Sequence, residues 1–292
     1  MSTRGRPKIG FALGSGSARG WAHIGVVREL LEHGVAPDVI GGCSIGALVG
    51  AALADDGLDQ LETWVAGLTM RDVVGLVDVG FGGGLLKGDK LIGFFEKHFV
   101  DRDFAELKTP FGCVATDLAT GREIWLREGS VAAAVRASIA VPGLFQPVSR
   151  DGRLLVDGAL VDPVPVSLCR ALGAEIVIAV DLGSDVVGSS LRRELAGEEK
   201  NGARWTKRLL ASLGLARNGD LPSMTSVLAT SIHIMETRIA RSRLAGEPAD
   251  VLISPRLGHL ALMDYHRGQE AMAEGRNAVK RMMPAIEHAL TP

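Results

Sequence analysis

The segment Gly42–Gly46 places a serine, Ser44, between two apolar patterns of different kinds. Pro37–Ile40 before it has the pattern of a strand, and Ala47–Leu53 after it has the pattern of a helix. A serine on such a turn is held in a strained backbone conformation, and the two flanking glycines leave room for it. The hydroxyl projects from the turn near the positive end of the following helix, which favours a nucleophile. The alternative is a helix-capping serine with glycines that serve packing.

Strand and helix patterns alternate from the start of the chain. A strand is predicted over Lys8–Leu13, followed by a glycine loop over Gly14–Gly20. A helix then runs to about His33, and Gly34 is its stop signal. The order strand, helix, strand, helix predicts a parallel sheet with helices on both faces, and therefore an α/β fold.

Later segments repeat both patterns. Strands are predicted over Phe111–Thr116, Glu123–Leu126, Arg153–Val156, Glu175–Val180 and Asp250–Ser254. Helices are predicted over Ser130–Ile139, Val166–Leu172 and Glu270–Ala289, and another has an apolar face of Met224, Leu228, Ile232, Met235 and Ile239. Gly183–Leu221 is mostly polar with short apolar patches, so we expect a mobile excursion from one domain spanning residues 1–292.

Composition excludes several classes of protein. The 292 residues are 47% hydrophobic and 23% charged, with a net charge of −2, so the basic face of a nucleic-acid-binding protein is not expected. Cys43, Cys113 and Cys169 each lie in an apolar run, which indicates reduced, buried thiols in a cytoplasmic protein. We see no metal-ligand spacing and no signal peptide. The longest uncharged run, Val39–Ala54, is shorter than the ~20 residues of a spanning helix.

A serine nucleophile needs a base and donors for the oxyanion that forms at the attacked carbonyl. Because the ends of adjacent parallel strands lie side by side, the Gly14–Gly20 loop and Ser44 should meet at one edge of the sheet. Gly16 and Ser17 can present backbone N–H groups there. Arg19 either adds positive charge to the site or pairs on the surface.

Two other interpretations of this loop stay open. A dinucleotide-binding turn is one, but the spacing is Gly-x-Gly-x-x-x-Gly, and the Ser44 turn replaces the acidic residue expected after the second strand. Simple helix packing by the glycines is the other.

The base is less obvious from local pattern. None of the seven histidines lies in a motif that demands catalysis. The segment Leu155–Ala159 places Asp157 at a strand end on a glycine turn, where it could act as a base if desolvated and within hydrogen-bond reach of the serine hydroxyl. An ordinary Asp-Gly turn is the alternative.

Four ordered segments together resemble the patatin-like phospholipase family, and in particular its bacterial single-domain RssA-like subgroup, which is related to the catalytic domain of neuropathy target esterase. These segments are Gly14–Gly25, Gly42–Gly46, Ala137–Val148 and Val156–Pro165. Val114–Gly121 and the tail around Asp264–Tyr265 are also similar. The resemblance covers nearly the whole chain and is weakest in Gly183–Leu221.

The resemblance implies a three-layer α/β/α fold with a mainly parallel sheet and a Ser–Asp dyad without histidine. Ser44 would be the acyl nucleophile and Asp157 the general base, with no cofactor. The implied oxyanion hole consists of backbone amides from Gly14, Ser15, Gly16, Ser17 and Arg19, and the supporting glycines are Gly42, Gly46 and Gly158. Many family members have consecutive glycines where this chain has Ser15 and Ser17, so the inward-pointing amides are not fixed by the resemblance.

The implied reaction is hydrolysis of carboxylic esters in phospholipids, lysophospholipids or other acyl lipids through an acyl-enzyme. The expected location is the cytoplasm, with at most peripheral contact with the inner membrane surface; a homo-oligomer stays possible. Two alternative functions remain: a Ser-His-Asp esterase using His259 or His266, and a regulatory or lipid-binding protein with low turnover. Gly183–Leu221 is a candidate lid or contact element, or else a surface insertion without a role.

Overall fold

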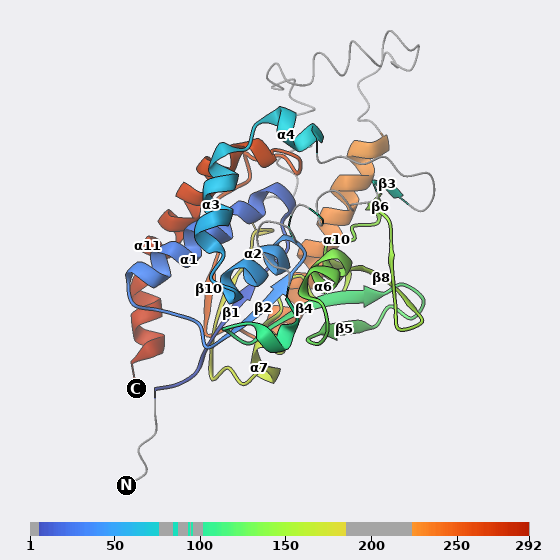
Figure 1. Cartoon of the computed structure of the whole chain (residues 1–292). Coiled ribbons are helices and arrows are strands. Elements are labelled where there is room, and N and C mark those ends of the chain that lie inside the picture. Colours follow the sequence, from blue (N-terminus) through green and yellow to red (C-terminus); the bar gives the residue numbers. More distant parts are fainter. Residues whose placement is uncertain are drawn as a thin grey trace.

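The computed structural model describes residues 6–75, 84–86, 93, 95, 102–184 and 224–291, and Figure 1 shows its elements. Within these described residues the main sheet has eight strands, ordered β10-β9-β1-β2-β4-β8-β7, with β5 also paired to β4. Its strands are β1 Ile9–Leu13, β2 Val39–Cys43, β4 Phe111–Asp117, β5 Glu123–Leu126, β7 Val148–Arg150, β8 Arg153–Asp157, β9 Ile176–Val180 and β10 Val251–Ile253.

The strands from β10 to β4 are parallel, whereas β5 and β8 run antiparallel to β4, and β7 runs antiparallel to β8. A separate parallel pair joins β3 Gly84–Leu86 to β6 Gly143–Phe145. The predicted mainly parallel sheet is therefore confirmed. Because β8 pairs with Ala115–Asp117 of β4, its last residue, Asp157, lies beside the central strands.

The central strands are buried on both faces, so their successive side chains enter two different cores. Phe11 and Leu13 of β1 lie in the larger core, and Ala12 lies in the smaller one. On β9, Ile178 belongs to the larger core and Val177 to the smaller. This alternation explains why both strands are continuous apolar runs in the sequence.

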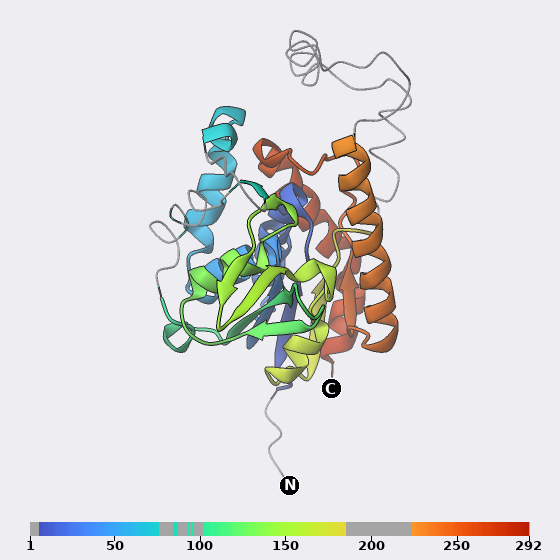
Figure 2. The ribbon, with the colours of Figure 1, turned by 90° about the vertical axis from the view of Figure 1, so that its right-hand side faces the viewer.

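The helices form the two outer layers. They are α1 Ala22–Glu32, α2 Ile45–Ala54, α3 Leu58–Gly67, α4 Met70–Gly75, α6 Val131–Ser138, α7 Val166–Ala171, α10 Met224–Gly246 and α11 Gly268–Leu290. Residues of α1, α2, α3, α6 and α11 line the larger core, and residues of α7 and α10 line the smaller one. In Figure 2 the orange helix α10 runs along one side of the sheet. The predicted three-layer α/β/α architecture is confirmed.

Short 3₁₀ turns complete the fold: η1 Ser17–Trp21, η2 Phe104–Glu106, η3 Gly158–Leu160 and η4 Tyr265–Arg267. The predicted strands and helices all form, with ends that differ by a few residues at most. In the predicted excursion, Gly183 and Ser184 are described, and the rest of Gly183–Leu221 lies outside the described residues.

The predicted apolar face of α10 is wrong in one respect. Met235 is 50% exposed, whereas His233, Thr237 and Ala240 are buried. His233 and Thr237 both lie against Gly183, close to the carboxylate of Asp181 that follows β9. The helix therefore buries polar side chains because it packs against the polar carboxyl end of the sheet, which apolar periodicity does not reveal.

Candidate active site

Ser44 lies on the turn between β2 and α2, with φ 55° and ψ −123°. The non-glycine residues with positive φ in the described part of the chain are Ser17, Ser44, Asp56 and Asp151. Both aspartates are exposed, and aspartate tolerates this backbone region comparatively well. Both serines follow central parallel strands at the carboxyl edge of the sheet. Strain of this kind persists where the surrounding fold enforces it, and it clusters at functional sites.

The three supporting glycines occupy places where no side chain fits. A Cβ at Gly46 would press into the carbonyl group of Leu13, and one at Gly42 would press into the first turn of α2. A Cβ at Gly158 would press into the carbonyl group of Val114 on β4. The glycines thus allow the Ser44 turn to pack against the end of β1 and the Asp157 turn to pack against β4.

Ser138, at the end of α6, holds the Ser44 turn from the other side. The Ser44 backbone N–H donates to Ser138 Oγ over 2.9 Å, and Ser138 Oγ donates to the Val114 carbonyl over 2.7 Å. Ser138 is completely buried. The Ser44 amide is therefore occupied, and an oxyanion would need donors from elsewhere.

Asp157 ends β8 and is brought next to Ser44 although the two residues are 113 positions apart. Ser44 Oγ donates to Asp157 Oδ2 over 2.6 Å, and Asp157 Oδ1 accepts the Ala159 N–H over 2.8 Å. Thr116 Oγ1 donates to the Asp157 carbonyl over 2.7 Å and fixes the backbone. Ser44 is 7% exposed and Asp157 is 1% exposed. The contact is thus a direct serine–carboxylate pair in a nearly dry setting.

The environment makes Asp157 a stronger base than an ordinary aspartate. Burial, and after it the negative charge of Glu236 on α10, raises the pKa of Asp157 to about 7. The hydrogen bonds from Ser44 and Ala159 oppose this rise because they stabilise the carboxylate. A carboxylate with a pKa near neutrality is matched to taking and returning a proton at neutral pH.

The glycine loop lies beside the Ser44 turn, as predicted, since Gly20 packs against Ile45. Three of the five predicted amides are already engaged: the Gly14 N–H donates to Val180, the Ser15 N–H to Pro163 and the Arg19 N–H to Gly16. Within the described part of the chain, the N–H groups of Gly16 and Ser17 have no hydrogen-bond acceptor. These two amides are therefore the candidates for an oxyanion hole.

Two buried side chains support this loop. His23 Nε2–H donates to the Gly14 carbonyl over 2.7 Å, and burial lowers the pKa of His23 to about 4, so its ring is neutral at neutral pH. Arg19 is fully buried, so the predicted alternative of surface pairing is wrong. Its Nε donates to the Gly16 carbonyl over 3.3 Å. Burial lowers the pKa of Arg19 to about 10, which leaves it positively charged near Glu236 and Asp181.

Helix α10 is fastened to the segment that follows Asp157. Arg243 Nη2 lies 3.4 Å from Asp162 Oδ2 and 2.9 Å from Glu123 Oε2. Asp162 is 1% exposed, and burial raises its pKa to about 7. This anchoring fixes the helix that carries Glu236 beside the candidate site.

Neither histidine of the alternative triad hydrogen-bonds to Ser44 in the part of the chain that the structure describes. His259 Nε2 pairs with Glu270 Oε1 on α11 over 2.7 Å. His266 lies in η4. Within the described residues, no histidine nitrogen hydrogen-bonds to Ser44, whose hydroxyl donates to Asp157.

The three cysteines are buried free thiols, as expected. Within residues 6–75, 84–86, 93, 95, 102–184 and 224–291, His, Cys, Asp and Glu side chains form no group of three or more suited to a metal ion. Over the same ranges, no helix combines the length and apolar character that crossing a membrane requires.

The structure is thus an α/β fold that presents a strained serine on a strand-to-helix turn, the arrangement typical of a nucleophile elbow. The sequence profile of the patatin-like phospholipase family matches residues 11–170, and the chain belongs to this family. Membership indicates a lipid acyl hydrolase. The interpretation of the glycine loop as a dinucleotide-binding turn is therefore not retained.

Two relatives, one bacterial and one mammalian, agree with this assignment. An uncharacterised NTE family protein of Mycobacterium tuberculosis is 32% identical over 96% of this chain and 92% of its own length. Patatin-like phospholipase domain-containing protein 7 of Mus musculus is 34% identical over 60% of this chain and 14% of its own length. Among solved structures, VipD from Legionella pneumophila matches with a TM-score of 0.49 and 13% identity, over 98% of this chain and 67% of that chain.

Sequence reasoning missed several residues that shape the site. Ser138 lies in a segment that carries the family resemblance, so its position was a usable signal. Tyr265 is the only tyrosine in the chain, and Glu236 interrupts an apolar helix face. His23 and Thr116 also lie in segments that resemble the family, Gly14–Gly25 and Val114–Gly121, but their roles depend on partners that only the folded chain brings near.

Proposed function

We propose that this protein is a serine acyl hydrolase that cleaves carboxylic esters of lipids, in the manner of a phospholipase A or lysophospholipase. The observation that carries the proposal is the 2.6 Å hydrogen bond from Ser44 Oγ to the buried carboxylate of Asp157. Support also comes from the strained turn that presents Ser44 and from the membership of a phospholipase family.

In the proposed acylation step, Asp157 takes the proton of the Ser44 hydroxyl as Oγ attacks the ester carbonyl carbon. The carbonyl oxygen becomes an oxyanion, and the N–H groups of Gly16 and Ser17 would donate to it. The tetrahedral intermediate then collapses. Protonated Asp157 returns the proton to the departing alcohol, which leaves the acyl group as an ester of Ser44.

Deacylation repeats the same steps with water as the nucleophile. Asp157 takes a proton from the water as its oxygen attacks the acyl carbonyl, and the same amides receive the second oxyanion. Collapse releases the carboxylic acid, and Asp157 returns the proton to Ser44 Oγ. One residue serves as base and then as acid in each half, which requires a pKa near the working pH.

The substrate class follows from the family. Acyl lipids reside in membranes or aggregates, so we propose a single-domain cytoplasmic protein that meets the inner membrane surface peripherally.

The test is hydrolysis of p-nitrophenyl butyrate, p-nitrophenyl octanoate and lysophosphatidylcholine by the purified protein. We expect turnover of all three, and the same turnover within about threefold in His259→Ala and His266→Ala, because neither histidine bonds to Ser44. Activity lost in either histidine variant would instead indicate a Ser-His-Asp esterase. Absence of turnover by the wild type on every ester would favour the lipid-binding alternative.

The pH dependence gives a second test. Because the ionised carboxylate of Asp157 is the proposed base and its pKa is about 7, kcat/KM should fall as the pH drops through about 7. Glu236→Gln removes a negative charge that disfavours this ionisation, so the pKa of Asp157 falls and activity should persist to lower pH.

The matched control for Glu236→Gln is Glu247→Gln, which removes the same charge just past the end of α10. Profiles of kcat/KM against pH for the three proteins make the comparison. An unchanged acid limb in Glu236→Gln, or an equal shift in both variants, would show that Glu236 does not act on the base.

A further inference from the structure

Ser17 has a backbone conformation that a serine does not adopt without support. Its φ is 53°, in the left-handed region where glycine is favoured. Of the five predicted oxyanion amides, those of Ser17 and the preceding Gly16 have no acceptor within the described residues. The direction of both N–H groups depends on this dihedral angle. Whatever holds Ser17 in place therefore aims the candidate oxyanion donors.

Two hydrogen bonds hold the Ser17 side chain. Ser17 Oγ donates to the Leu262 carbonyl over 2.7 Å, and the Tyr265 hydroxyl lies 2.8 Å from the same Oγ. A hydroxyl has one proton, and a carbonyl oxygen only accepts, so the Ser17 proton goes to Leu262. Tyr265 must then be the donor to Ser17. Burial raises the pKa of Tyr265, so the phenol keeps this proton at neutral pH.

The backbone around Ser17 makes further contacts with the same segment. The Ala18 N–H donates to the Leu262 carbonyl over 3.2 Å. Trp21 Nε1–H donates to the Tyr265 carbonyl over 3.1 Å, and the two rings meet edge to face with centroids 6.0 Å apart. Hydrogen bonds therefore join the loop after β1 to the segment 262–265 at both ends of η1.

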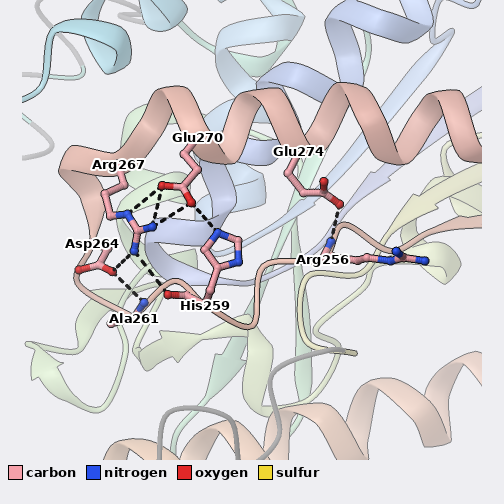
Figure 3. Close-up of polar contacts among 7 residues, drawn as sticks. All are labelled: Arg256, His259, Ala261, Asp264, Arg267, Glu270 and Glu274. Atoms are coloured by element: carbon pink, nitrogen blue, oxygen red, sulfur yellow. Dashed lines mark hydrogen bonds and ion pairs between the residues drawn. The ribbon is translucent and has the colours of Figure 1, made fainter. Parts of the chain in front are cut away.

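The segment 259–267 is itself fastened to the start of α11, as Figure 3 shows. Arg267 Nη2 donates to Glu270 Oε2 over 2.7 Å, and Glu270 Oε1 pairs with His259 Nε2 over 2.7 Å. Asp264 Oδ2 accepts from Arg267 Nη1 over 3.3 Å and from the Ala261 N–H over 3.0 Å. The contacts of Asp264 and Arg267, which flank Tyr265 in the chain, hold Tyr265 in place against Ser17.

We propose that Tyr265 is a positioning residue that, through its hydrogen bond to Ser17, holds the Gly16 and Ser17 amides in the orientation that receives the oxyanion. This inference rests on the proposed hydrolase function. Tyr265 does not need to touch the substrate. Its hydrogen bond to the Ser17 hydroxyl stabilises the positive φ of Ser17, a conformation that glycine would adopt without such support.

A double-mutant cycle on Ser17 and Tyr265 tests the link. In the Ser17 background, Tyr265→Phe keeps the ring and loses the donor, and we expect kcat for p-nitrophenyl butyrate to fall by about tenfold or more with KM changed less than about twofold. In the Ser17→Gly background, glycine adopts the positive φ without help. There the same Tyr265→Phe change should alter kcat by less than about twofold. Met263→Ala, an exposed residue of the same segment, is the control and should match the wild type.

An equal loss of kcat from Tyr265→Phe in both backgrounds would overturn the inference, because Tyr265 would then act independently of Ser17. So would an unchanged kcat in the single variant. Hydrogen exchange of the peptide covering residues 14–21 tests the positioning role of Tyr265 independently of the proposed hydrolase function. Faster exchange in Tyr265→Phe than in the wild type is expected whether or not any ester is hydrolysed. Unchanged exchange would reject the positioning role, and absent turnover by the wild type would reject the hydrolase.

Discussion

Ser44→Ala should abolish ester hydrolysis, with kcat/KM at least about 10³-fold below the wild type. The hydroxyl of Ser44 is the group that donates to the Asp157 carboxylate, and no acyl-enzyme can form without it. The proposed oxyanion donors at Gly16 and Ser17 remain in this variant, so a small residual rate above the uncatalysed reaction is expected. Steady-state hydrolysis of p-nitrophenyl octanoate measures the loss. Intact mass after brief mixing should show an acyl adduct on the wild type and none on the variant.

The control for Ser44→Ala is Ser130→Ala. Ser130 caps α6, its Oγ accepts the Ala133 N–H, and it lies outside the site, so its loss should cost about 1 kcal/mol of stability and leave kcat unchanged. Comparison of Ser44→Ala with Ser130→Ala separates an effect on stability from an effect on the catalytic step. Hydrolysis at the wild-type rate by Ser44→Ala would place the nucleophile elsewhere, and an acyl adduct on another residue would identify it.

The parts of the site that the sequence predicts are those encoded by short-range signals. Ser44 and Asp157 each lie on a glycine turn directly after a strand, and such turns are specified by the residues beside them. The α/β fold follows in the same way from alternating apolar patterns. The contact between the two residues needs the strand order, in which β8 folds back beside β4. The family resemblance supplied that pairing, since local pattern does not.

The parts that sequence reasoning missed depend on distant partners. Tyr265 reaches Ser17 across 248 positions, and no local pattern links them. Arg19 was open to a surface role because arginine is rarely buried, yet the polar end of α10 gives it a charged environment inside the protein. The same polar environment explains why the buried face of α10 was misjudged from apolar spacing.

Asp157→Asn should lower kcat/KM by about 10³-fold while the protein stays folded. Asparagine has nearly the same shape as aspartate, and its oxygen can still accept the hydrogen bond from the Ala159 N–H. The neutral amide, however, cannot take the proton of Ser44. In the wild type, activity should fall below a pH of about 7 because Asp157 becomes protonated. In Asp157→Asn this acid limb of the pH profile, the fall in activity below a pH of about 7, should disappear. The residual rate should instead rise steadily with hydroxide concentration.

Asp162→Asn is the matched control for the Asp157→Asn profile. Asp162 lies five residues further along, is equally buried, and also has a pKa raised to about 7, so either carboxyl group could produce an acid limb at that pH. The difference is in their contacts, because Asp162 pairs with Arg243 and Ser167 and not with Ser44. We therefore expect Asp162→Asn to keep both the limb and a rate within about threefold of the wild type. If the limb vanished in Asp162→Asn and persisted in Asp157→Asn, the titrating group that controls the reaction would be Asp162, and the dyad would lose its base.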